Sequence, residues 1–165
     1  MLYTILLYYI LYFTMLYIFI HTGRIQAIQL EYSESYQRLI LSLRKIHITK
    51  FTNIFNLIIT KLIIIVQLLM GEIPEKRVFG QENVENREIL YPYLLITQAV
   101  KNGDLTLFHN IIQKYNNIFK LDKNLTLINR LSHNVLKTGL RKLSLSYSKI
   151  SLADVAGKIY IDVYV

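Results

Sequence analysis

The stretch Asn124–Ile161, NLTLINRLSHNVLKTGLRKLSLSYSKISLADVAGKIYI, decides the fold of this chain. Its first part predicts one long amphipathic helix capped by Asn124, because apolar residues recur at three- and four-residue steps. A short polar turn, Ser146–Lys149, follows this helix. Ser151-Leu152-Ala153-Asp154 then has the spacing of a capping box at the start of a second helix. A helix, a short turn and a capped helix predict helix-turn-helix geometry, the first half of a winged helix.

Four segments of the sequence resemble one family, in the family's own order. Residues 133–160, HNVLKTGLRKLSLSYSKISLADVAGKIY, resemble the PCI domain, a module shared by scaffold subunits of the proteasome lid, the signalosome and a translation initiation factor. Three further segments resemble PCI subunits of the proteasome lid: TGRIQAIQLEYSES at 22–35, LLMGEIPEKRVF at 68–79 and YPYLLITQAVKNGDLTLFHNII at 91–112. The resemblance implies a non-catalytic scaffold subunit of the 26S proteasome regulatory particle lid, in cytoplasm and nucleus. Its partners would be other PCI-domain lid subunits, and its role would be assembly for ubiquitin-dependent protein degradation.

The family pattern extends beyond both ends of this sequence. A winged helix needs a third helix and a two-stranded wing after the segment that closes at Val165. The chain is therefore expected to be truncated at both ends relative to the family. Apolar residues of the second helix would then lack cover, so we expect the isolated chain to be marginally stable or prone to aggregate.

The N-terminal stretch has two interpretations. Met1–Ile20 carries no charge and has the length and hydropathy of a transmembrane helix, so a small membrane-anchored protein is one alternative. The other interpretation is a buried helix of a helical repeat, because residues 16–22 lie where the family has an aromatic-rich helix. Residues 1–21 are thus expected to form an apolar helix, in which 1–14 have no family counterpart.

Residues 22–70 predict a segment of helical repeats similar to tetratricopeptide (TPR) repeats. One helix is expected to end near Leu30, with a turn at Glu31-Tyr32 and a second helix over Ser33–Ile46. Phe51–Met70 is the most apolar internal stretch and is apolar around the whole circumference of a helix, which is typical of a helix in a core.

Residues 71–88 are rich in polar residues and predict a surface loop, and residues 89–165 predict the helical part of the PCI region with its incomplete winged helix. Ile89–Asn102 is expected to be helical with Pro92 near its first turn. Gly103 is expected to take a positive φ, and Asp104 to cap a helix over Leu105–Phe119. The predicted fold class is all-α, an α-solenoid leading into a partial PCI winged-helix domain.

The charge of the chain raises a competing function. Residues 114–165 carry nine Lys or Arg against three Asp, and a basic helix-turn-helix is typical of nucleic-acid-binding proteins. The alternative, which the resemblance favours, is that these cations form solvated helix faces or meet acidic partner subunits.

The sequence shows no pattern of a catalytic, metal or cofactor site. It has no Cys, and its four His, at 21, 47, 109 and 133, have no pair at the spacing that places two imidazoles on one helical face. We interpret His133 as a helix-packing or hydrogen-bonding residue. Glycine-rich phosphate loops and nucleophile elbows are absent from the sequence. We therefore expect no enzyme, no cofactor and no small-molecule substrate.

The candidate subunit interface is the turn after the long helix: Ser148, Lys149, Ile150 and Ser151. The resemblance implies that this turn precedes a short edge strand of the winged-helix sheet, which adjacent PCI subunits join side by side. The turn surrounds one apolar residue, Ile150, whose backbone could pair with a partner edge. An internal turn with Ile150 in the domain's own core is the equally favoured alternative.

Overall fold

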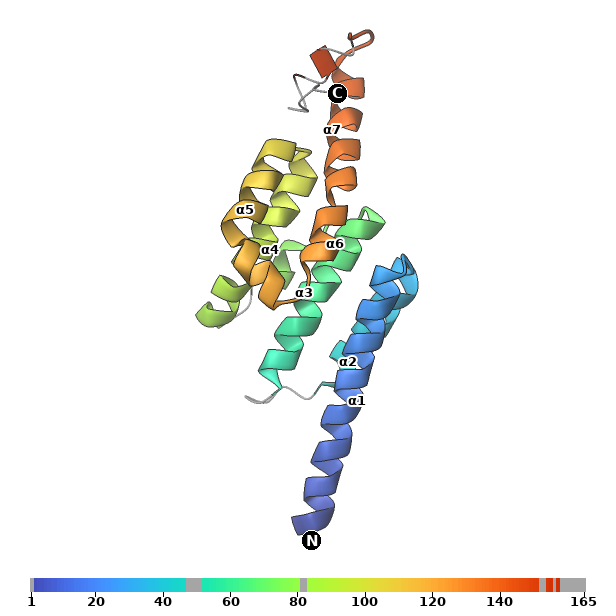
Figure 1. Cartoon of the computed structure of the whole chain (residues 1–165), viewed down its shortest axis with the longest axis vertical. Coiled ribbons are helices and arrows are strands. Elements are labelled where there is room, and N and C mark those ends of the chain that lie inside the picture. The colour runs from blue at the N-terminus through green and yellow to red at the C-terminus, as the bar shows by residue number, and fades with distance from the viewer. Residues whose placement is uncertain (1, 47–51, 81–82, 152–153, 156, 158–165) are drawn as a thin grey trace. The chain divides into compact units, whose positions relative to one another are not determined.

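The computed structural model describes residues 2–46, 52–80, 83–151, 154–155 and 157. Within the first helix it describes the side chains at 3, 7 and from 10 onward. The described residues form helices and no strand, which confirms the all-α prediction. The chain divides into two compact units, Met1–Met70 and Gly71–Val165 (Figure 1).

The first unit contains α1 (Leu2–Ile28), α2 (Tyr32–Lys45) and α3 (Asn53–Met70). Helices α1 and α2 lie side by side and antiparallel (Figure 1), as expected for a TPR-like pair. The Leu39 side chain packs directly on Gly23, since a Cβ atom on Gly23 would lie 2.9 Å from Leu39 Cδ2. The buried Ser35 hydroxyl donates a hydrogen bond of 2.7 Å to the Gly23 carbonyl, which ties the two helices at the same point.

The α1–α2 turn differs by one residue from the expected turn at Glu31-Tyr32. Leu30 takes a left-handed φ of 73°, and the Glu31 N–H donates to the Gln26 carbonyl at 2.9 Å. This arrangement closes the end of α1 in the manner of a Schellman motif, so Tyr32 is already the first residue of α2.

Helix α3 is the core helix that its composition predicts. Every residue from Ile59 to Val66 is buried, which includes all sides of the helix. Among the residues searched, α3 is also the one helix with the length and hydropathy to cross a membrane, but 56% of it is buried inside the protein. That burial is typical of a helix in a protein core.

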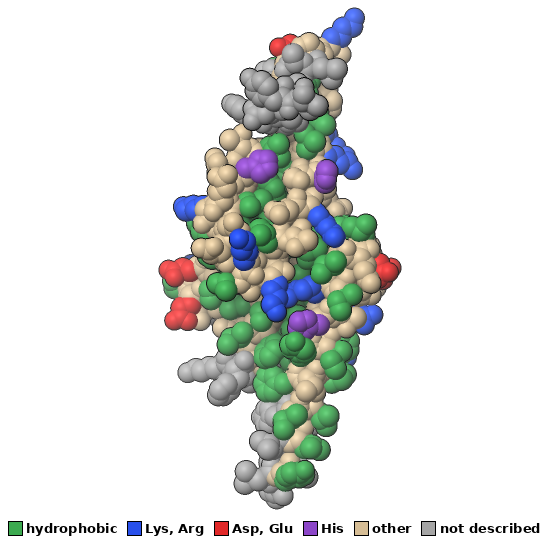
Figure 2. All heavy atoms as spheres, viewed as in Figure 1, with side chains coloured by type: hydrophobic (Ala, Val, Ile, Leu, Met, Phe, Trp, Pro, Cys, Tyr) green, Lys and Arg blue, Asp and Glu red, His purple; other side chains and the backbone are tan. Residues whose placement is uncertain are grey.

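Helix α1 exposes apolar side chains along its N-terminal half. Figure 2 shows apolar side chains and no charged ones on this part of the helix, among the side chains described. The exposed residues are Tyr3, Leu7, Ile10, Leu11, Met15, Tyr17 and Ile18. The opposite side of the helix is buried at Leu16 and Ile20. The expected membrane span, 1–20, includes a residue and several side chains outside the described set, so it stays a prediction.

Among its described residues, the second unit contains a short 3₁₀ turn, η1 (Lys76–Val78), followed by α4 (Val84–Asn102), α5 (Leu105–Leu121), α6 (Leu125–Arg130) and α7 (Ser132–Ser146). Helix α4 begins five residues before the expected start at Ile89, because the Asn83 side chain caps it by accepting from the Glu85 N–H at 3.1 Å. The segment 71–88 is therefore not a loop throughout. Pro92 lies inside α4 rather than in its first turn.

The expectation of one long helix after Asn124 is wrong, because α6 and α7 are separated at Leu131. The Leu131 N–H donates to the Ile128 carbonyl three residues back, and the Ser132 hydroxyl donates to the Asn129 carbonyl at 2.9 Å. The Leu131 bond spans three residues instead of four, so the chain makes one tighter turn between the two helices.

Glycines with positive φ follow α4 and α3, and the first of these, Gly103, was predicted. Gly103 has a φ of 66° after α4, and Gly71 has a φ of 87° after α3. The Asp104 carboxylate accepts from the Leu107 N–H at 2.8 Å and so caps α5, as expected.

Candidate assembly surface

The candidate turn follows directly from the end of α7. Tyr147 leaves the helix with extended backbone, at φ −131° and ψ 126°, while its N–H still bonds the Leu143 carbonyl at 3.0 Å. Ser148, Lys149 and Ser151 are exposed, and Ile150 is half-buried. The four residues therefore lie together at the surface of their unit. Whether they form an interface stays a prediction.

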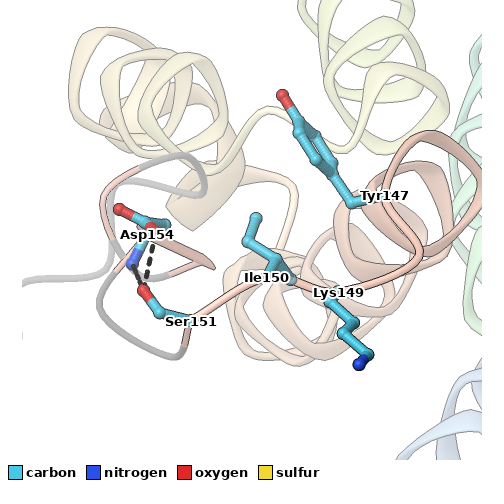
Figure 3. Close-up of a pocket in the computed structure, with 5 residues that line it drawn as sticks. All are labelled: Tyr147, Lys149, Ile150, Ser151 and Asp154. Carbon is cyan, nitrogen blue, oxygen red and sulfur yellow. Dashed lines mark hydrogen bonds between the residues drawn. The ribbon is translucent and has the colours of Figure 1, made fainter.

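The serine half of the predicted capping box at Ser151 is present, and the Asp154 carboxylate bonds the serine hydroxyl. The Ser151 hydroxyl oxygen accepts from the Asp154 N–H at 3.1 Å and donates to the Asp154 carboxylate at 2.6 Å (Figure 3). The Val155 N–H bonds the Ser151 carbonyl at 3.0 Å, which is the first helical hydrogen bond after the cap. Of the apolar face expected on this helix, Val155 is half-buried, and Leu152, Ala156 and Ile159 lie outside the described residues.

An open depression of about 390 Å³ lies over the turn. Its lining residues are Tyr147, Lys149, Ile150, Ser151 and Asp154. In Figure 3 the Ile150 and Tyr147 side chains point to one side of the turn, and the Lys149 side chain extends to the other. The turn thus presents one apolar and one aromatic side chain together, with a cation on its opposite side.

Helix α7 is held against α4 by a contact between two glycines. A Cβ atom on Gly103 would lie 2.5 Å from the Gly139 nitrogen, and one on Gly139 would lie 2.9 Å from the Gly103 carbonyl oxygen. Both distances are too short for any real side chain, so the two backbones touch. One helical turn onward, the Lys142 ammonium donates to the Asn102 carbonyl at 3.0 Å and caps the C-terminal end of α4. The last turn of α7 then extends past α4 (Figure 1).

A buried polar network fixes the α5–α6 junction against α4. The Tyr93 hydroxyl donates to the Asp122 carboxylate at 2.7 Å and accepts from the Asn124 side-chain amide at 3.1 Å. Tyr93 and Asn124 are each 1% exposed. The Tyr93 ring also packs edge-on against Phe119, with ring centres 5.5 Å apart. The expectation that Asn124 caps a helix is wrong, because its amide is part of this network and makes no cap bond.

The expectation for His133 is corrected as well. The residue is exposed on α7, on the side away from the buried Val135, and does not pack between helices. Among the described residues, no group of three or more His, Asp or Glu lies close enough to hold a metal ion.

Sequence reasoning missed the Gly103–Gly139 contact, the Lys142 tether and the Tyr93 network. A signal existed for the first, since a glycine inside an amphipathic helix often marks a close backbone approach. No pattern of spacing could have connected Tyr93 to residues 29 and 31 positions away.

Comparison with known protein families finds two matches in this sequence. Residues 14–97 match the family model described as PSMD3-like, N-terminal TPR repeats, which covers just over half of the sequence. The chain belongs to the PSMD3-like family. Residues 112–163 match the model of the PCI domain, so the candidate turn lies within the PCI match. The two matches confirm the predicted α-solenoid that leads into a PCI region.

Curated relatives of this PSMD3-like chain are regulatory subunits of the 26S proteasome. It is 49% identical over 142 residues to the probable 26S proteasome regulatory subunit rpn3 of Schizosaccharomyces pombe. It is 44% identical over 144 residues to the 26S proteasome non-ATPase regulatory subunit 3 of Dictyostelium discoideum, and 43% identical over 142 residues to the probable subunit 3 of Drosophila melanogaster. These alignments cover 86–87% of this chain and 28% of each relative. The chain therefore spans less than a third of the length of these relatives.

Proposed function

We propose that this chain is a non-catalytic scaffold region of the lid of the 26S proteasome regulatory particle. In this role it holds neighbouring PCI subunits together for the degradation of ubiquitinated proteins, in cytoplasm and nucleus. The observation that carries the proposal is the identity of 42–49% to curated regulatory subunits of the 26S proteasome, together with the PCI match over 112–163.

The domain roles follow from the same proposal. Residues 22–70 act as a TPR-like segment, residues 71–88 connect it to the PCI region, and residues 89–165 carry the surface that meets the next subunit. Residues 1–21 form an apolar helix, and the PSMD3-like match begins at residue 14 of it.

Within the PCI region, we assign subunit contact to the turn Ser148–Ser151. Three of its residues are exposed, and the side chain of Ile150 lies beside Tyr147 in an open depression. Backbone groups of such a turn are available to pair with the edge of a partner sheet.

The test replaces Ile150 by Pro, which removes one backbone N–H from the turn and fixes its φ. We expect Ile150→Pro to reduce co-sedimentation of the tagged chain with the lid in cell extracts. The matched control is Val84→Pro, because Val84 is exposed and is the first residue of α4, where proline is tolerated. Unchanged co-sedimentation of the Ile150 variant would contradict the assignment of the turn. Failure of the unmodified chain to co-sediment would contradict the scaffold role itself.

A membrane-anchored protein is a second candidate function, because the N-terminal half of α1 exposes apolar side chains. Carbonate extraction of the endogenous protein separates the two proposals. A protein that spans the bilayer stays in the membrane pellet, and a lid component is released to the supernatant.

A further inference from the structure

Every Lys, Arg, Asp or Glu in the segment from α6 to the candidate turn is a Lys or Arg. Residues 124–151 carry five Lys or Arg and contain no Asp or Glu. Lys142 is engaged with the Asn102 carbonyl at the end of α4. Lys137 and Arg141 are exposed on α7, and among the described residues neither forms an ion pair.

Two exposed cations and one histidine lie on one face of α7. His133, Lys137 and Arg141 follow one another at four-residue steps, so their side chains form one ridge along the helix. The helix is buried on its other side, at Val135 and Gly139.

An apolar ridge runs beside the basic one. Leu136, Leu140, Leu143 and Tyr147 are also three or four residues apart, so they line up along α7 next to the cations. Leu140 is 43% exposed and Tyr147 41% exposed, while Leu136 and Leu143 are half-buried. We call the two ridges together the basic–apolar face. Its Tyr147 end joins the depression over the candidate turn (Figure 3).

We propose that the basic–apolar face binds an acidic amphipathic helix of a neighbouring subunit. Carboxylates on one side of that helix meet Lys137 and Arg141, and its apolar side chains pack on Leu136 and Leu140. Opposite charge steers the partner and sets its orientation, and the apolar ridge supplies buried area. This inference rests on the proposed function, since the partner is a subunit of the same assembly.

The apolar ridge favours a protein helix over nucleic acid as the partner. Proteins that bind single strands place aromatic rings beside their cations so that bases stack, and contacts to duplex phosphates come from polar groups. Three of the four residues in the apolar ridge are leucines, which serve neither purpose. A second amphipathic helix can pair with both ridges of α7, because its own apolar and charged residues recur at the same spacing.

The test uses the tagged full chain in cells, with a photo-crosslinking amino acid in place of Lys137. The matched control carries it in place of Lys114, an exposed lysine on α5. Crosslinked peptides are identified by mass spectrometry. We expect the position-137 probe to yield a peptide of a lid subunit that is rich in Asp and Glu with apolar residues at helical spacing, and the position-114 probe not to yield it.

Charge reversal supplies an independent readout. We expect Lys137→Glu with Arg141→Glu to lower recovery of that crosslinked subunit about tenfold, as for paired charges at an interface. Lys114→Glu with Lys120→Glu makes the same change in net charge elsewhere and is expected to leave recovery unchanged.

The outcomes separate the inference from the function on which it rests. Recovery of lid subunits without an acidic peptide at position 137, or a crosslink to nucleic acid there, would overturn the inference and leave the scaffold role intact. Absence of all lid subunits from the purified chain would overturn both.

Discussion

Gly103 and Gly139 touch through their backbones, and this contact sets the distance between the end of α4 and the middle of α7. A Cβ atom on Gly103 would approach the Gly139 nitrogen to 2.5 Å and its Cα to 2.7 Å. Neither backbone can yield as a flexible side chain could, so the contact excludes every residue other than glycine at position 103.

Gly103→Ala is therefore expected to lower the free energy of unfolding by about 3 kcal/mol. The left-handed φ of 66° costs an alanine about 1–2 kcal/mol, and forcing α7 away adds overpacking of about 1–3 kcal/mol. Urea denaturation followed by circular dichroism measures the loss. Gly71→Ala is the control, because Gly71 also has a positive φ but has nothing within 4 Å of its added Cβ. Equal losses in the two variants would show that the Gly103–Gly139 contact contributes nothing.

Tyr93→Phe removes the hydroxyl that links Asp122 to Asn124. We expect the free energy of unfolding to fall by about 1–3 kcal/mol, because the Asp122 carboxylate and the Asn124 amide each lose a hydrogen bond to the Tyr93 hydroxyl. Tyr91→Phe is the control on the same helix, where the side chain is 50% exposed and the expected change is within about 0.5 kcal/mol. A Tyr93 variant as stable as the Tyr91 variant would show that the network does not hold the α5–α6 junction.

Exposed apolar side chains on α1 are expected to make the isolated chain self-associate. Replacing Leu11 and Ile18 by Lys adds charge to the exposed stripe and should raise the fraction of monomer in sedimentation velocity experiments. Ser33→Lys with Gln37→Lys adds the same charge to the exposed side of α2 and is expected to have a smaller effect. A gain in monomer that is equal in both variants would assign the effect to net charge alone.

Ser151→Ala removes the hydroxyl that caps the turn after α7. The loss of a serine N-cap costs about 1 kcal/mol, which corresponds to about fivefold faster amide hydrogen exchange at Asp154 and Val155 if the segment opens locally. Ser148→Ala is the control, since Ser148 is exposed and makes no cap. Unchanged exchange in the Ser151 variant would contradict a stabilising role of the cap.

Local signals predicted the elements that depend on neighbours in sequence. The apolar circumference of Phe51–Met70, the glycine after α4 and the caps at Asp104 and Ser151 are all read from spacings of a few residues, and each was found. The start of α4 was missed although Asn83 is a good capping residue, because the polar run around it is equally typical of a loop.

Long-range contacts explain the other errors. Asn124 has the right residue type for a cap, but its side chain is turned to the buried Tyr93 hydroxyl, to which its amide nitrogen donates. The break at Leu131 is a single three-residue turn that keeps the apolar spacing, so no periodicity reports it. The candidate turn was predicted from a resemblance. Its surroundings depend on the position of α7 against α4, which is set by the contacts of Gly139 and Lys142.

Two contacts with α4, at Gly139 and Lys142, hold α7 just before its last turn. The segment from Leu143 to Ser151, which includes the candidate turn, lies beyond these two contacts. A force applied to the turn is therefore transmitted first to the Lys142–Asn102 hydrogen bond and the glycine contact. A change at either contact would therefore alter where the candidate turn lies relative to α4.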